Sequence, residues 1–262
     1  MAADQTILFH STIFGPIHSR RLGTSLGVNL SPSDGKVCSF DCLYCEAGYN
    51  SQGAGTAGFP SREAVASGLR DKLAAMHRDS SPLDVITFSG NGEPTLHPQF
   101  AEIVGDTLAL RDEYYPEAKV SVLCNSTRLD RKDVADALRR VDNNILKLDS
   151  AVEETMRLID RPTQRSFTVE KVVGELAGFG KECIIQTMML RGTHDGKTVD
   201  NTTDAEIDAL AEAYGKIRPA YVMLYSIDRS TPEENLRKVE RDELEQIARR
   251  LADKSGVKVT VS

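Results

Sequence analysis

Short apolar segments alternate with longer amphipathic segments along most of the chain. Six of the short segments are rich in β-branched and apolar residues and predict buried strands at 26–30, 84–90, 119–125, 144–150, 183–190 and 220–227. The longer segments repeat apolar positions with the helical period and predict helices over 61–78, 98–111, 131–140, 168–180, 204–217 and 239–253. A last short strand is expected at 257–262, and no internal repeat is evident. This alternation predicts six βα units around a parallel sheet.

Six such units fit either a doubly wound open sheet or an incomplete barrel. Polar residues distinguish the two, because ligands of parallel α/β folds sit at the carboxyl ends of the strands. A chemically distinctive group follows each predicted strand: the cysteine loop from Cys38, then Glu93, Asn125, Asp149, Arg191, and Asp228 with Arg229. Six groups on one rim favour an α/β fold of the partial (β/α)6 TIM-type barrel class, with parallel strands in a single domain. We expect a lead-in over 1–25, the six units over 26–227, and a closing helix and strand over 228–262.

The composition agrees with one large domain. The chain has 262 residues, a net charge of -7, 40% hydrophobic residues and no Trp. No apolar run approaches the roughly 18 residues that span a bilayer, and the start lacks a signal-peptide pattern, so a cytoplasmic location without membrane contact is expected. The acidic balance disfavours a broad nucleic-acid face, although His18, Arg20 and Arg21 form a basic group for an anionic substrate or a reductant.

Three of the five cysteines lie in the segment CSFDCLYC, at Cys38, Cys42 and Cys45. An odd number with three clustered disfavours a disulfide framework. Thiolates suit zinc, copper(I) or iron–sulfur clusters, but a structural zinc site needs a fourth ligand, and none lies nearby in sequence. A redox pair of Cys42 and Cys45 would leave Cys38 unexplained. Three cysteines around a cubane of four irons would instead leave one iron open to a small molecule.

The segment CSFDCLYC, with an aromatic residue before its last cysteine, resembles the CxxxCxxC motif of radical S-adenosylmethionine (radical SAM) enzymes. In that family three cysteines hold a [4Fe-4S] cluster, SAM chelates the open iron, and one electron cleaves SAM to methionine and a 5'-deoxyadenosyl radical. The segment FSGNGEPTLHP similarly resembles the family's GGE motif, so the resemblance implies SAM contacts at Asn91, Gly92 and Glu93. Glycine permits close backbone approach, and a carboxylate suits the methionine ammonium.

The resemblance runs from about residue 15 to about residue 232, and the family's fold is the partial (β/α)6 barrel already expected. The segment GPIHSRRLGTSLGVNL is similar to the lead-in of a subgroup of radical SAM Fe-S oxidoreductases related to the tRNA wyosine-forming branch. The segment SIDRSTPEE over 226–234 also resembles a motif of that subgroup.

Other rim residues are candidates for the same site. Lys147 and Asp149 stand two apart on a predicted strand and face the same way, so they form a structural ion pair, contact SAM or move a substrate proton. We take them as the candidate catalytic residues. For Asn125 an Asx turn competes with a cofactor contact, and for Met188 core packing does. With these two, the remaining candidate cofactor-binding residues are Tyr44, Pro94, Ser126 and Tyr225.

The expected protein is thus an oxidoreductase that removes a hydrogen atom from a substrate not identified by the sequence. The resemblance implies an electron donor such as flavodoxin or ferredoxin, and a small-molecule or RNA substrate. A second cluster is not expected, because only Cys124 and Cys183 remain. Two alternatives stay open: a zinc-binding structural module, and a non-catalytic protein that binds SAM and a cluster. A tRNA- or nucleobase-modifying enzyme of the wyosine-related type is the alternative within the enzyme class.

Overall fold

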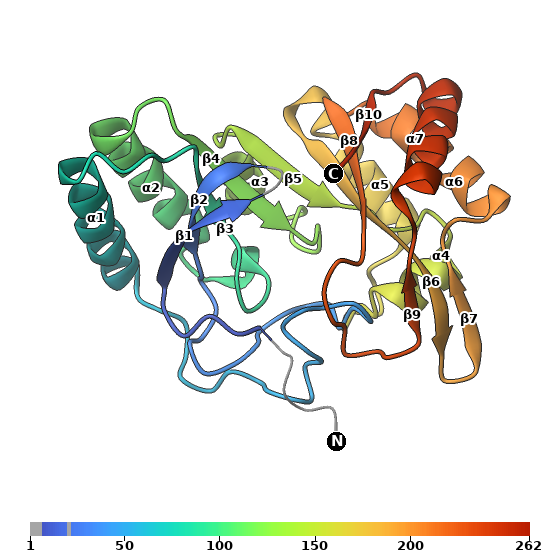
Figure 1. Ribbon diagram of the computed structural model, residues 1–262, viewed down its shortest axis with the longest axis horizontal. Helices are drawn as coiled ribbons and strands as arrows, with labels where there is room; N and C mark the ends of the chain where they lie inside the picture. Colours follow the sequence, from blue (N-terminus) through green and yellow to red (C-terminus); the bar gives the residue numbers. More distant parts are fainter. Residues whose placement is uncertain (1–6, 20–21) are drawn as a thin grey trace.

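One curved sheet of ten strands organises the chain (Figure 1). The computed structural model describes residues 7–19 and 22–262, so Arg20 and Arg21 of the basic group lie outside the described residues. The strands are β1 Ile13–Ser19, β2 Gly23–Val28, β3 Val85–Phe88, β4 Lys119–Cys124, β5 Asn143–Lys147, β6 Ile184–His194, β7 Lys197–Asp200, β8 Tyr221–Ser226, β9 Leu236–Lys238 and β10 Val259–Val261. The helices are α1 Arg62–Arg78, α2 Phe100–Tyr114, α3 Lys132–Leu138, α4 Glu153–Ile159, α5 Val169–Ala177, α6 Asp204–Ile217 and α7 Arg241–Ser255, with short 3-10 turns at Pro94–Leu96 and Gly180–Glu182.

The six predicted parallel strands are confirmed as β2, β3, β4, β5, β6 and β8, each paired in parallel with the next. Strand β10 adds a seventh parallel strand beside β8, as the short terminal segment predicted. The path runs from β1 at one edge to β10 at the other, so the sheet curves without closing. The fold is therefore the α/β partial barrel expected from the sequence.

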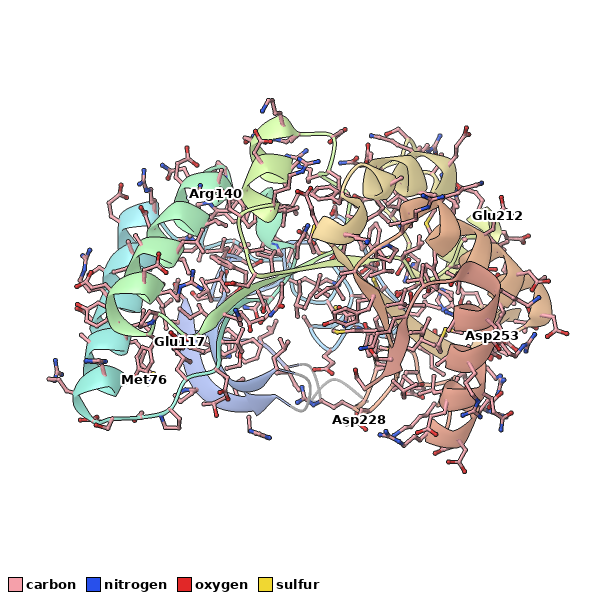
Figure 2. The ribbon with its side chains drawn as sticks, turned by 90° about the horizontal axis from the view of Figure 1, so that it is seen from above. Met76, Glu117, Arg140, Glu212, Asp228 and Asp253 are labelled. Atoms are coloured by element: carbon pink, nitrogen blue, oxygen red, sulfur yellow. The ribbon has the colours of Figure 1, made fainter. Side chains whose placement is uncertain are left out.

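Alternate residues of these strands face opposite sides, and their composition differs by side. Leu26, Ile86 and Leu146 are fully buried in the core shared with the helices. Figure 2 shows this helical layer from above, with Arg140 on one flank, Glu212 and Asp253 on the other, and Asp228 at the open side between them. The inward side instead borders a cavity, with small polar residues such as Ser25 and Thr87 on β2 and β3 and apolar residues such as Leu123 and Ile145 on β4 and β5.

Strand β1 was not predicted as a strand. It forms an antiparallel hairpin with β2, and its register shifts between Phe14 and Ile17, where Gly15 and Pro16 interrupt it. Proline is tolerated in sheets on edge strands and at bulges. Strand β1 is an edge strand, and Pro16 lies at its register shift. The same interruption removes the alternation that would mark a strand in the sequence.

The carboxyl end of β6 also extends further than predicted. Residues 190–194 leave the barrel and pair antiparallel with β7 on one side and β9 on the other, forming a small projecting sheet (Figure 1). Helix α4 was likewise not predicted. These elements are three to seven residues long, too short to show a clear period. No helix in the described part of the chain combines the length and the apolar character needed to cross a membrane.

Candidate active site

The three clustered cysteines lie on the loop between β2 and α1, at the carboxyl rim of the barrel. All three are free thiols, with Cys42 buried and Cys38 and Cys45 half-buried. Burial and then the Glu93 carboxylate raise the pKa of Cys38 to about 11, and Cys45 contributes to the same shift. Burial also raises the pKa of Cys42, with further contributions from Cys45 and Cys38. The three thiols therefore lie within electrostatic range of one another.

This donor set fits an iron–sulfur cluster better than a single ion. Across residues 7–19 and 22–262, no three His, Cys, Asp or Glu side chains are arranged to hold one metal ion. In a cubane each cysteine binds a different iron, so its ligands stand further apart than those of a single zinc ion. Three thiols on one short loop supply the ligand number and type for a cubane with one open iron.

Backbone hydrogen bonds attach the cysteine loop to both sides of the rim. On the β3 side, Val37 N donates to Asn91 O over 3.1 Å and Glu93 N donates to Val37 O over 3.1 Å. On the α4 side, Asp41 N donates to Asp160 O over 3.0 Å and Leu43 N to Ile159 O over 2.9 Å. The positions of the thiols are thus fixed by two elements that are remote in sequence.

Gly92 lies between the two residues, Asn91 and Glu93, whose backbones are hydrogen-bonded to Val37 of the cysteine loop. A Cβ atom there would lie 1.9 Å from Val37 O, so any side chain would push the cysteine loop away. The Asn91 side chain is fully buried, with Oδ1 accepting from Phe9 N over 2.7 Å and Nδ2 donating to the carbonyls of Phe9 and Pro32. The predicted Asn91–Gly92 segment therefore supports the loop through its backbone and holds the N-terminal segment through its amide.

Glu93 connects the ends of two strands. Its side chain is 3% exposed. Oε1 accepts from Thr95 N over 3.0 Å and from Thr95 Oγ1 over 2.6 Å, while Oε2 accepts from Asn125 N over 2.6 Å. Burial raises its pKa despite these hydrogen bonds, and Pro94 begins the 3-10 turn that the carboxylate caps. Cys124 is a further hydrogen-bonding neighbour, so these contacts account for the roughly four acceptor sites of a carboxylate, and a donor such as an ammonium would share or replace one of them.

The predicted Asx turn after β4 is present. Asn125 Oδ1 accepts from Thr127 N over 3.1 Å, and Asn125 Nδ2 donates to Ser39 Oγ over 2.9 Å and lies 3.6 Å from Cys38 Sγ. Ser126 takes a left-handed backbone with φ of 70° and donates from Oγ to Lys147 O over 3.0 Å. Both predicted residues thus brace the rim, and Asn125 lies beside the thiol of Cys38.

Lys147, Asp149 and Tyr44 meet in a buried network. The Tyr44 hydroxyl is hydrogen-bonded to Lys147 Nζ and to Asp149 Oδ2, and Lys147 Nζ lies 3.1 Å from Asp149 Oδ2. Asp149 Oδ1 accepts from Met188 N over 2.8 Å, and Met188 is the register partner of Tyr225 on β8. Burial opposes the charged form of Lys147, but Asp149 and Cys42 outweigh it, so the pKa of Lys147 is raised. Because β5 ends at Lys147, Asp149 lies beyond the strand rather than on it.

Two residues near the cysteines were missed by the sequence analysis. Lys36 is 2% exposed; its Nζ donates to Gly48 O over 2.7 Å and lies 3.7 Å from Asp41 Oδ1. Asp160 Oδ1 lies 3.6 Å from Cys42 Sγ and 3.8 Å from Lys147 Nζ. The position of Lys36 two residues before Cys38 was an available signal. Asp160 had none, because it follows the helix that was not predicted.

A cavity of about 350 Å³ fills the inside of the barrel next to this rim. Strand residues line its wall, including Ser25, Gly27, Thr87, Leu123, Ile145 and Met223. At its mouth Arg229 Nη1 donates to Glu46 Oε2 over 2.7 Å, and His18 borders the same space. Glu46 directly follows Cys45, so the cavity reaches the cysteine loop.

The two other cysteines lie in packed surroundings. Cys124 is buried and its Sγ accepts from Ser126 N over 3.3 Å. Cys183 is buried just before β6, at the end of the barrel opposite the rim, with its Sγ 3.3 Å from Gly180 O. Neither lies on the cysteine loop, and both are buried, as is usual for free cysteines.

Comparisons with known proteins identify the family and several relatives of this chain. Residues 33–205 match the family described as "Radical SAM superfamily". Two curated proteins are similar: the GTPase Obg of Brachyspira hyodysenteriae, 26% identical over 254 residues, and the UPF0026 protein MJ1312 of Methanocaldococcus jannaschii, 32% identical over 182 residues. The matches cover 95% and 68% of this chain but only 35% and 53% of the relatives, so the chain spans well under two thirds of either.

A solved structure with a similar fold is also found. The structure of TYW1 with a lysine–pyruvate adduct has a TM-score of 0.63 over 91% of this chain and 76% of that chain, at 16% identity. At this identity the likeness concerns the fold alone. The family match, by contrast, covers more than half of the chain and includes the cysteine loop and the Asn91–Glu93 segment, and on that ground the chain belongs to the radical SAM superfamily.

Proposed function

We propose that the protein is a radical SAM enzyme in which Cys38, Cys42 and Cys45 hold the [4Fe-4S] cluster that this superfamily implies. When bound, the cluster and SAM supply reductive cleavage of SAM to a 5'-deoxyadenosyl radical, which removes a hydrogen atom from the substrate. The observation that carries the proposal is the position of the three thiols, gathered on one loop at the rim and next to the barrel cavity.

The chain's own residues have distinct tasks in this proposal. Gly92 keeps the β3 end against the cysteine loop, and Glu93 supplies the carboxylate for the methionine ammonium, which would share or replace one of its present donors. Lys147 and Asp149 hold the hydroxyl of Tyr44, a residue of the cysteine loop, and Asp149 also holds the Met188 backbone. Met188 and Tyr225 are register partners on the adjacent strands β6 and β8, and we assign them to the cofactor side of the site. The protein thereby positions the cofactor and limits access of water.

The cavity favours a small-molecule substrate. Its volume is at the lower end of the range of about 300–1,000 Å³ that is usual for ligand pockets, and the net charge of -7 disfavours a polyanion. The lead-in similar to the wyosine-related subgroup makes a tRNA base the alternative substrate. A gel shift with tRNA that weakens steeply with salt would favour that alternative, whereas no shift at low salt supports a small molecule. An electron donor such as flavodoxin or ferredoxin completes the proposed reaction.

The test is anaerobic reconstitution with iron and sulfide, followed by SAM and dithionite. We expect brown protein with about four irons and formation of 5'-deoxyadenosine, measured by chromatography. Cys42→Ala should lose the iron, and Cys183→Ala, a buried cysteine away from the loop, should keep it. A colourless zinc protein would contradict the proposal. Iron without 5'-deoxyadenosine in the presence of SAM would instead support the non-catalytic binding protein.

A further inference from the structure

Two lysines lie against the cysteine loop on different sides: Lys36, which is buried, and Lys147, whose side chain is 17% exposed. Lys147 Nζ approaches to 4.0 Å from Cys42 Sγ. Lys36 Nζ donates to the carbonyl of Gly48, whose own N–H closes a turn onto Cys45 O over 2.9 Å. One ammonium therefore adjoins Cys42 and the other underlies the Cys45 turn.

Burying a lysine is unfavourable unless its charge is compensated. Each ammonium has carboxylate neighbours, Asp149 and Asp160 around Lys147 and Asp41 near Lys36. An ion pair that only stabilises the fold does not need to lie next to a thiol. In this chain of net charge -7, both ammonium groups lie beside the loop that carries the three thiols. A cluster held by three thiolates is anionic, and reduction adds one more negative charge to it. Nearby positive charge stabilises the reduced form more than the oxidised form, because the attraction grows with the charge.

We propose that Lys36 and Lys147 raise the reduction potential of the cluster by placing positive charge, buried at Lys36 and half-buried at Lys147, against the cysteine loop. The inference rests on the proposed function, since it requires the cluster at Cys38, Cys42 and Cys45. Both lysines are positioning residues here: they act through the cysteine loop. Reduction transfers one electron from the reductant to the cluster, and no bond is made or broken in that step.

The experiment is an anaerobic redox titration of the reconstituted protein without SAM, followed by electron paramagnetic resonance of the reduced cluster. Lys147→Met and Lys36→Met are each expected to lower the equilibrium constant for reduction about tenfold, which for one electron corresponds to about 59 mV. Asp149→Asn removes the opposite charge from the same network and should shift the potential the other way. Lys171→Met is the matched control, because Lys171 pairs with Asp130 and Glu175 on the surface of α5.

Iron content separates the two proposals. If wild-type protein binds no iron, the proposed function fails and this inference fails with it. If iron is bound and the lysine variants keep the wild-type potential, the proposed function stands and the inference is overturned. Where Lys147→Met does not retain iron, Lys147→Arg decides: iron at the wild-type potential supports a role for the charge, and a lowered potential with the charge kept contradicts it.

Discussion

Gly92 leaves no room for a side chain beneath the cysteine loop. Because a Cβ atom would lie 1.9 Å from Val37 O, Gly92→Ala should lower the free energy of unfolding by about 3 kcal/mol, as measured by urea denaturation. Gly53→Ala is the control, since a Cβ atom there meets nothing within 4 Å, and it should change stability by less than about 0.5 kcal/mol. Equal midpoints for both variants would contradict the close approach at Gly92.

Tyr44 and Tyr49 provide a second matched pair on the same loop. The Tyr44 hydroxyl lies between Lys147 and Asp149, so Tyr44→Phe leaves buried groups without a partner and should cost about 1–3 kcal/mol of unfolding free energy. The Tyr49 hydroxyl is buried and has no hydrogen-bond partner among the described residues. Tyr49→Phe should therefore be neutral or stabilising in the same denaturation experiment. A larger loss for Tyr49→Phe than for Tyr44→Phe would refute this difference.

At the residue scale, the sequence identified the groups that chemistry makes unusual. The spacing of the cysteines and the glycine before Glu93 predicted the site from the sequence, because these positions require those residue types. The contacts of Asp160 were not, since it meets Cys42 across 118 residues of chain. Such a contact depends on how α4 packs against the loop, which no local pattern specifies. Whether the predicted residues bind the cofactors stays a prediction.

At the scale of an element, helix α6 carries two carboxyls with opposite titration behaviour. Burial raises the pKa of Glu206 above 4.5, so its stabilising contribution is full below that value and is lost as pH rises through the folded pKa. Lys216 lowers the pKa of exposed Glu212, whose contribution is instead lost as pH falls. Glu206→Gln should therefore gain stability relative to wild type between about pH 4 and about pH 7, and Glu212→Gln should lose it. Urea denaturation at both pH values tests this, and shifts of the same sign would contradict it.

The elements found by sequence reasoning are those with a long or regular pattern. The six barrel strands and the longer helices show apolar positions at their own period, and all are present. Strand β7 pairs with β6 as the second strand of a hairpin. Strand β9 pairs with the other side of β6 and follows it in the chain only after α6 and β8. Their sequences carry no signal of their own, because the stabilising partner lies elsewhere in the chain.

For the whole molecule, cluster loading should raise the thermal midpoint. The cysteine loop joins β3 to α4 through backbone hydrogen bonds, so a group bound by the loop stabilises the folded state of the entire chain. A gain of about 3 kcal/mol, as for a ligand about 100-fold above its dissociation constant, corresponds to an increase of roughly 5–10 °C. Scanning calorimetry before and after reconstitution measures it. Cys42→Ala should show no increase, and an equal increase in that variant would indicate iron bound elsewhere.

The ion pair between Glu46 and Arg229 joins residues that are 183 positions apart and spans the cavity mouth. Their side chains are 46% and 61% exposed, so dissolved ions screen the attraction, with a Debye length near 30 Å at about 0.01 M salt and near 8 Å at about 0.15 M. Access to the barrel interior should consequently depend on the buffer as well as on the shape of the candidate compound. A substrate screen carried out in dilute buffer alone would examine the protein with this bridge at its strongest, and compounds that enter readily at physiological salt would be scored as inactive.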